Sequence, residues 1–295
     1  MANPWQDLSR PPLRQAPLRR ALTEGEQPAW RHLDVVPETG STNADLAERA
    51  RAGDLEGAVL VTDHQVSGRG RRDRSWTAPP RASIAMSVLL RPPPAVPVER
   101  WSWLTLLAGV AVTDALQQTC GLAASLKWPN DVLVPVYPLG HPIGPDPEYG
   151  KVAGLLAELV VTGTGPLVVL GLGLNVSQDA DELPVPTATS LKLAGSAVLD
   201  RDTVLRSVLR ALSERYRAWT AAGGDPRSGP AAVYRERCDT IGRQVRVDLP
   251  DGGTLEGRAE GVDDEGRLLV RTPEDAESRA LSAGDVVHIR PSEPA

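Results

Sequence analysis

The chain has 295 residues, a formal net charge of -6 and a sequence pI near 5.4. This acidic balance argues against a nucleic-acid coat or a polybasic membrane binder, since both need a basic surface. Cys120 and Cys238 are too few and too far apart for a disulfide framework or a zinc site. No stretch reaches the ~18–20 apolar residues of a membrane helix, and the N-terminus lacks the apolar core of a signal peptide. We expect a globular cytoplasmic protein.

The start of the chain differs in composition from the rest. Residues 1–28 are rich in proline and arginine and show no periodicity, which predicts a flexible leader that is too short for a helix-turn-helix domain. We therefore expect no binding to DNA. From Trp30 the patterns become regular. A helix is predicted over 40–53, because Thr42 and Asp45 match the capping pattern at its start.

Hydrophobic patterning predicts the remaining elements of the first 237 residues. Alternating or continuous apolar runs predict strands over 30–36, 57–65, 82–91, 125–134 (broken by Pro129), 150–161 and 165–176. Helical spacing is also possible for 152–161, but the valine content and the turn that follows favour a strand. Helical periodicity predicts helices over 99–120, 200–224 and 231–237. Proline and glycine predict irregular loops over 135–149 and 183–190.

The pattern changes near residue 235. Short alternating segments separated by turns such as PDGG and DDEG predict a small all-β barrel. The sequence therefore predicts a mixed α/β (α+β) domain over 29–228, with a mixed β-sheet flanked by helices, and a second, all-β domain over 235–292.

An unusual basic loop follows the strand over 57–65. The segment GRGRRDR (68–74) places four arginines and two glycines in seven positions and is followed by Trp76. Such runs are commonly solvated surface. Here Gly68 and Gly70 allow close backbone approach, arginines bind phosphate and carboxylate oxygens, and Trp76 offers a stacking face. GRGRRD lacks the third glycine of a dinucleotide-binding motif, and the stretch before Lys151 lacks the spacing of a Walker loop, so the arginine loop predicts another kind of site for a nucleotide or for the end of a nucleic acid.

Three further motifs have both a structural and a functional interpretation. The segment KWPND (127–131) is either a strand end with a turn, or a polar group in which Lys127 meets a phosphate and Asp131 a metal or base. Lys151 in GKVAGLLAEL either extends to water or neutralises an anion. GLGLNV (171–176) is either a bulge or a place where a ligand lies against the backbone.

Together these motifs carry a family resemblance. In this order and spacing, GSTN, Q-x-x-GRGR, W, KWPND, GK-x-AG-x-L-x-E and G-x-G-x-N resemble the catalytic domain of biotin protein ligases, or biotin–[acetyl-CoA-carboxylase] ligases, across about residues 38–176. The β-rich tail resembles the SH3-like domain of that family. The resemblance implies the biotin/lipoate ligase fold, of the monofunctional type without an N-terminal DNA-binding domain.

The resemblance implies an ATP-dependent ligase that makes biotinyl-5′-AMP and transfers biotin to a lysine of a biotin carboxyl carrier domain. It implies biotin-binding roles for Ser41, Thr42, Asn43, Gln65, Arg69, Gly70, Arg71 and Lys151. Hydroxyl and amide groups suit a ureido ring. Magnesium is expected with ATP, although the sequence indicates no metal ligands. The resemblance also implies that the carrier belongs to acetyl-CoA carboxylase or a related biotin-dependent carboxylase.

The same resemblance implies a nucleotide site and a catalytic group. Its adenylate-binding residues are Gly68, Arg69, Arg71, Arg72, Arg74, Trp76, Lys127, Asn130 and Asn175. Lys151 and Arg69 would neutralise repulsion between the biotin carboxylate and the α-phosphate, and Asp131 would assist deprotonation of the acceptor amine. The family commonly has glycine where this chain has Asp73.

Two other functions remain open at this point. A lipoate–protein ligase shares the fold and the adenylation chemistry, but the GRGR and KWPND segments favour biotin. A nucleotide- or nucleic-acid-binding module would place the arginine loop on phosphates and stack a base on Trp76, but the acidic charge and the lack of a basic stripe oppose it.

Overall fold

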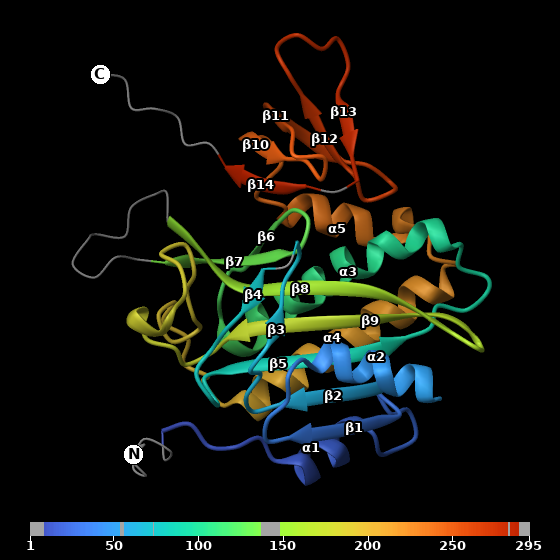
Figure 1. The fold of residues 1–295 in the computed structure, drawn as a ribbon, viewed down its shortest axis with the longest axis vertical. Helices are drawn as coiled ribbons and strands as arrows, with labels where there is room; N and C mark the ends of the chain where they lie inside the picture. Colours follow the sequence, from blue (N-terminus) through green and yellow to red (C-terminus); the bar gives the residue numbers. More distant parts are fainter. Residues whose placement is uncertain (1–8, 54–55, 73, 137–147, 283, 289–295) are drawn as a thin grey trace.

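A seven-stranded mixed sheet forms the centre of the molecule. The computed structural model describes residues 9–53, 56–72, 74–136, 148–282 and 284–288. The sheet has the order β1-β2-β5-β9-β8-β7-β6; β1 and β2 are parallel and the other neighbours antiparallel (Figure 1). Its strands are β1 (His32–Val36), β2 (Ala58–Thr62), β5 (Ser83–Leu90), β6 (Ser125–Lys127), β7 (Asp131–Val136), β8 (Glu148–Thr162) and β9 (Gly165–Asn175).

Helices cover both faces of this sheet, which explains its apolar strands. All eight residues of β5 are buried. On one face the core continues into α3 (Trp103–Ala115) and α4 (Arg201–Ala221), and on the other α2 (Thr42–Ala52) packs through Leu46 and Ala50 (Figure 1). Strands covered on both faces have apolar residues at successive positions instead of alternating ones. The predicted mixed sheet with flanking helices is confirmed.

The ends of the helices follow from local sequence. Ser41 caps α2 by accepting a hydrogen bond from the Ala44 N–H, and α2 ends at Gly53, whose φ of 115° favours glycine. The Asp200 side chain caps α4. The predicted helix over 99–120 is confirmed as α3 with a 3₁₀ turn before it and a π turn after it. The short helix predicted over 231–237 is α5 (Pro230–Arg237).

The prediction of a flexible leader over 1–28 is wrong for residues 15–22. These residues form α1 (Gln15–Leu22), which packs against β1 and α4 with Leu18 and Leu22 fully buried. Arg14 pairs with Asp202 at 2.5 Å. The prolines and arginines concealed a short leucine repeat that buries apolar surface. Residues 1–8 lie outside the described part of the chain.

Two predictions around the KWPND segment also need correction. Residues 125–134 form two strands, β6 and β7, which pair as a hairpin with Lys127 opposite Asp131. Pro129 therefore marks a chain reversal and not an interrupted strand. The predicted loop over 135–149 is shorter, because β7 continues to Val136 and β8 begins at Glu148. Residues 137–147 lie outside the described residues.

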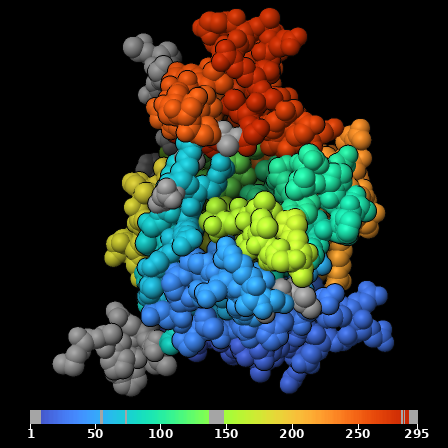
Figure 2. Space-filling model, turned by 45° about the vertical axis from the view of Figure 1, so that its right-hand side comes forward, coloured from blue at the N-terminus to red at the C-terminus, as the bar shows by residue number. Residues whose placement is uncertain are grey.

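The C-terminal part is a second, antiparallel sheet, as predicted. Its order is β13-β12-β11-β10-β14, and α5 precedes it. The strands are β10 (Gln244–Asp248), β11 (Thr254–Val262), β12 (Leu268–Arg271), β13 (Arg279–Leu281) and β14 (Asp285–His288). Figure 2 shows this orange and red part seated on the larger one, with the cyan segment that includes the arginine loop reaching up to it. Among the described residues, no helix is long and apolar enough to cross a membrane.

Candidate active site

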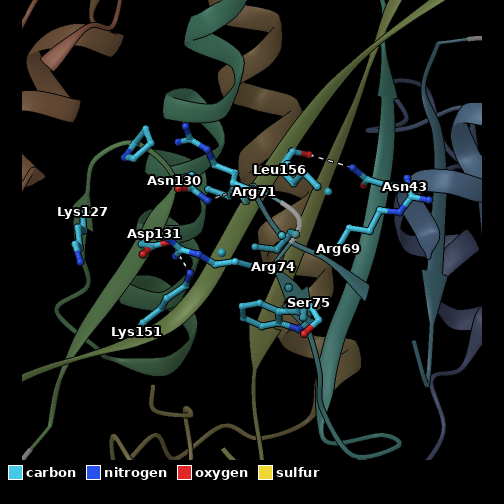
Figure 3. A pocket seen from close by; sticks show the side chains of 18 of the residues that line it. Asn43, Arg69, Arg71, Arg74, Ser75, Lys127, Asn130, Asp131, Lys151 and Leu156 are labelled. Carbon is cyan, nitrogen blue, oxygen red and sulfur yellow. Dashed lines mark hydrogen bonds and ion pairs between the residues drawn. The ribbon is translucent and has the colours of Figure 1, made fainter. Parts of the chain in front are cut away.

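A cavity of about 260 Å³ opens between the large sheet, the arginine loop and the C-terminal sheet (Figure 3). It gathers residues from α2, β8, β9, the β6–β7 hairpin and the loop after β2. The sequence-predicted residues that line it are Ser41, Thr42, Asn43, Gln65, Arg69, Gly70, Arg71, Arg74, Trp76, Lys127, Asn130, Asp131 and Lys151. Segments separated by more than 100 residues thus form one site.

One end of the cavity is a neutral polar cluster at the start of α2. Gln65 accepts hydrogen bonds through Oε1 from the Thr42 backbone N–H, at 2.9 Å, and from its hydroxyl, at 3.2 Å. The fully buried Ser87 donates to Asn43 Oδ1 at 2.6 Å, and Asn43 Nδ2 donates to Glu158 at 2.6 Å. The donors and acceptors of this end are therefore held in fixed directions before any ligand arrives.

The arginine loop forms a small hairpin over the cavity. Strands β3 (Gly68–Arg69) and β4 (Ser75–Trp76) pair, and the Gly70 N–H donates to the Arg74 carbonyl at 2.6 Å. A Cβ at Gly68 would lie 2.3 Å from both the Gln65 side chain and the Trp76 carbonyl oxygen. Only glycine fits there, so Gly68 sets the path of the loop without lining the cavity.

Trp76 packs against two facing glycines of the sheet. Gly154 on β8 pairs with Gly173 on β9, and a Cβ at Gly173 would lie 2.4 Å from Trp76 Cε2. The ammonium of Lys151 lies 5.8 Å from the centroid of the indole ring. The missing side chains therefore create the room in which the ring forms one wall of the cavity.

Lys151 and Asp131 form an ion pair of 2.6 Å at the other end of the cavity (Figure 3). Strict alternation along β8 would place residues 151 and 154 on opposite faces. A bulge at Val152 changes this, so that a Cβ on Gly154 would lie 3.3 Å from Lys151 Nζ. The bulge thus turns the lysine into the cavity.

The β6–β7 turn is fixed to the sheet beside this pair. Asn130 exchanges two hydrogen bonds with Leu155 on β8: its Nδ2 donates to the Leu155 carbonyl at 2.8 Å, and its carbonyl accepts from the Leu155 N–H at 2.9 Å. The Trp128–Pro129 peptide bond is cis. Lys127 and Asp131 face each other across the turn.

Besides Gly68, two predicted nucleotide-binding residues do not line this cavity. Asn175 is 4% exposed; its Nδ2 donates to the Thr189 carbonyl at 2.9 Å and its Oδ1 accepts from Gln178. These bonds give Asn175 a structural role here. Arg72 has a positive φ of 52° in the arginine loop and does not line the cavity. Asp73 lies outside the described residues.

Several residues of the site were missed from the sequence. Ser87 and Glu158 hold Asn43, and Asp248, Val286 and Val287 line the cavity from the C-terminal sheet. The pair of glycines in GLGLNV gave a signal for backbone close to a ligand. An isolated serine within an apolar strand, or an aspartate in a distant domain, gives none.

Neither cysteine nor a metal cluster contributes to the described site. Burial raises the pKa of both the Cys120 and the Cys238 thiol, which keeps them protonated and unreactive. Within the described ranges, no three His, Cys, Asp or Glu side chains are grouped to hold a metal. The cavity instead concentrates charge: five cationic side chains and two carboxylates line it.

This fold and this cavity fit one class of protein, the biotin/lipoate protein ligases. The family model "Biotin/lipoate A/B protein ligase family" matches residues 36–175, and "Biotin protein ligase C terminal domain" matches 240–289. The second match covers the all-β part, as expected for the SH3-like domain.

Individual relatives make the assignment more specific. The chain is 44% identical to a biotin–[acetyl-CoA-carboxylase] ligase of Mycobacterium tuberculosis, over 97% of this chain and 99% of that protein. It is 32% identical to the bifunctional ligase/repressor BirA of Bacillus subtilis, over 82% of this chain and 69% of that protein. The structure of an Aquifex aeolicus biotin protein ligase with biotin and ATP matches with a TM-score of 0.69 at 29% identity, over 88% of this chain and all of that one. The chain belongs to the biotin protein ligase family.

Proposed function

We propose that this protein activates biotin with ATP to biotinyl-5′-AMP and then transfers biotin to a lysine of a biotin carboxyl carrier domain. The main observation behind this proposal is that one cavity has a neutral polar end and a cationic end. The Aquifex relative, described in complex with biotin and ATP, supports this pair of substrates. The name of the mycobacterial relative supports acetyl-CoA carboxylase as the source of the carrier.

In this proposal, Thr42 and Gln65 bind the ureido ring. Gln65 Oε1 is occupied by two bonds to Thr42, which directs its amide Nε2 away from that residue. An amide donor suits the ureido carbonyl. Asn43 acts indirectly in this proposal, because Ser87, Glu158 and the Leu156 carbonyl already occupy its side chain.

In this proposal, Lys151, Arg69 and Arg71 promote the activation of biotin. A biotin carboxylate oxygen attacks the α-phosphorus, the new C–O–P link forms, and pyrophosphate leaves with the electrons of the broken P–O bond. Both reactants are anions, so cations that bridge them lower the barrier. Lys151 would leave its ion pair with Asp131 and bind the biotin carboxylate and the α-phosphate instead.

Transfer requires no covalent enzyme intermediate. The carrier amine attacks the biotinyl carbonyl, an amide bond forms, and AMP leaves with the electrons of the carbonyl–oxygen bond. The attacking amine must lose a proton. Asp131, which forms the ion pair with Lys151 in the cavity, is the carboxylate that would accept it. Magnesium would arrive with ATP and neutralise part of the triphosphate charge.

The test is pyrophosphate–ATP exchange by the full chain. We expect exchange that depends on biotin, followed by transfer of biotin to a purified carrier domain. Exchange that depends on lipoate would favour the lipoate ligase. Salt-sensitive binding to an oligonucleotide, with no biotin-dependent use of ATP, would instead identify a nucleic-acid-binding module. Cytoplasmic location stays a prediction.

A further inference from the structure

The C-terminal sheet contacts the KWPND turn at its tryptophan. Trp128 is 2% exposed, and its indole Nε1 donates to the Gly266 carbonyl at 3.0 Å. Its backbone N–H donates to the hydroxyl of Thr240 at 3.0 Å. Both acceptors belong to the C-terminal part, while the residues on either side of Trp128 line the cavity. The turn is thus held from outside its own domain.

Thr240 is itself fixed by a second contact. It is fully buried, and its hydroxyl lies 3.1 Å from Nε2 of His288 on β14. Just before it, the Asp239 N–H donates to the Leu126 carbonyl at 2.8 Å, next to Lys127. Burial, together with the charge of Lys127, lowers the pKa of His288 to about 4, so the ring is neutral near pH 7. The Thr240 hydroxyl therefore has two fixed partners, the Trp128 N–H and the His288 ring.

The turn over residues 263–267 accepts three hydrogen bonds from the catalytic part. Three successive carbonyls of this turn accept from the catalytic part: Asp264 from Trp103 Nε1, at 2.7 Å, Glu265 from the Ser102 hydroxyl, at 2.9 Å, and Gly266 from Trp128. A Cβ at Gly266 would lie 2.9 Å from a methyl carbon of Leu106, so the turn packs directly on α3. Only the third contact involves the KWPND turn.

We propose that Thr240 and the Gly266 carbonyl are positioning groups for adenylation: they hold Trp128 and so set Lys127, Asn130 and Asp131 around the nucleotide. The inference deepens the proposed function and rests on it. Hydrogen bonds at both its backbone and its ring hold Trp128 in one position relative to the C-terminal part. Displacement of catalytic groups by about 1 Å can cost up to about 100-fold in rate.

The proposal predicts that ATP use is impaired and biotin binding is not. The biotin end, with Thr42 and Gln65, makes none of its described contacts with Thr240 or Trp128. In the full chain, Thr240→Val keeps the shape but removes the hydroxyl, and Trp128→Phe removes the indole donor. Both should lower kcat/KM for ATP about 10- to 100-fold in biotin-dependent pyrophosphate exchange, with the Kd for biotin alone changed less than about twofold.

The controls separate positioning from general stability. Trp103→Phe and Ser102→Ala each remove one hydrogen bond to the same 263–267 turn without touching the KWPND turn, and should keep the kcat/KM for ATP. Thr240→Ser should restore it by returning the hydroxyl. Equal loss in Trp103→Phe and Trp128→Phe, or unchanged ATP kinetics in both Thr240→Val and Trp128→Phe, would overturn the inference. Absence of biotin-dependent exchange in the unmodified chain would instead overturn the proposed function.

Discussion

Ser87 offers a sharp test of how the neutral end of the cavity is organised. Its hydroxyl donates to Asn43 Oδ1 at 2.6 Å and lies 2.8 Å from Thr42 Oγ1. Ser87→Ala removes that donor from a site where Asn43 is only 4% exposed. A buried acceptor without its donor costs about 1–3 kcal/mol, so the free energy of unfolding should fall by that amount.

The same change should weaken biotin binding. Without the serine, the side chains of Thr42 and Asn43 lose their common anchor and must be ordered by the ligand. An ordering cost of about 1 kcal/mol corresponds to about a fivefold rise in the Kd for biotin. Urea denaturation gives the stability term and isothermal calorimetry gives the affinity.

Ser125→Ala is the matched control for this experiment. The Ser125 hydroxyl is also buried, but within the described part of the chain it has no hydrogen-bond partner. Removing it should leave stability unchanged or slightly raised, because no acceptor loses a donor and a buried polar atom disappears. If Ser87→Ala and Ser125→Ala gave the same stability and the same Kd for biotin, the network around Asn43 would have no energetic role.

Three further predictions concern charge, space and pH. Lys151→Gln should slow biotin-dependent pyrophosphate exchange about 10²- to 10³-fold, yet lower stability by less than about 1 kcal/mol, because the ion pair is partly exposed. Gly173→Ala should displace the Trp76 ring, since the new Cβ would lie 2.4 Å from Cε2, and so lower the kcat/KM for ATP in biotin-dependent pyrophosphate exchange, because Trp76 is a predicted adenylate-binding residue. His288→Gln should reduce the loss of stability in acid, measured by denaturation at several pH values. The folded protein keeps His288 neutral down to about pH 4, whereas the unfolded chain takes up its proton near pH 6.5, so stability falls with pH between these values.

Each of these three predictions has a control variant or a result that would contradict it. Lys192→Gln breaks another lysine–aspartate pair, to Asp179 at 2.7 Å, outside the cavity, and should leave exchange intact. Gly163→Ala introduces a methyl where no atom lies within 4 Å, so the kcat/KM for ATP should persist. A decline of stability between pH 6.5 and 4 that is equally steep in His288→Gln and the unmodified chain would contradict the role of His288.

The sequence predicted the elements well where apolar periodicity was long. The strands around 82–91 and 165–176 and the helix over 200–224 fold within a few residues of the predicted limits. It failed at residues 15–22, where only two leucines of a polar segment become fully buried, against partners far along the chain. A local pattern cannot show burial that distant residues provide.

The site was predictable as a set of residue types but not as a geometry. The placement of Lys151 depends on a bulge that breaks the alternation of β8, and the sequence contains no pattern that predicts this bulge. Asn175 has the composition of a ligand-binding residue, yet two hydrogen bonds within the protein occupy it. Which polar groups remain available is decided by packing, and packing is set by the whole fold.

The charge of the cavity explains how an acidic protein can hold two anions. The chain carries a formal net charge of -6, but five of its cationic side chains face one cavity with two carboxylates. Asp131 holds Lys151 at 2.6 Å, so the lysine is already oriented while its charge is partly balanced. A single weak anion gains little by displacing that carboxylate. A biotin carboxylate and a triphosphate bound together would offset the loss of the Lys151–Asp131 ion pair. This favours adenylation only when both substrates are present.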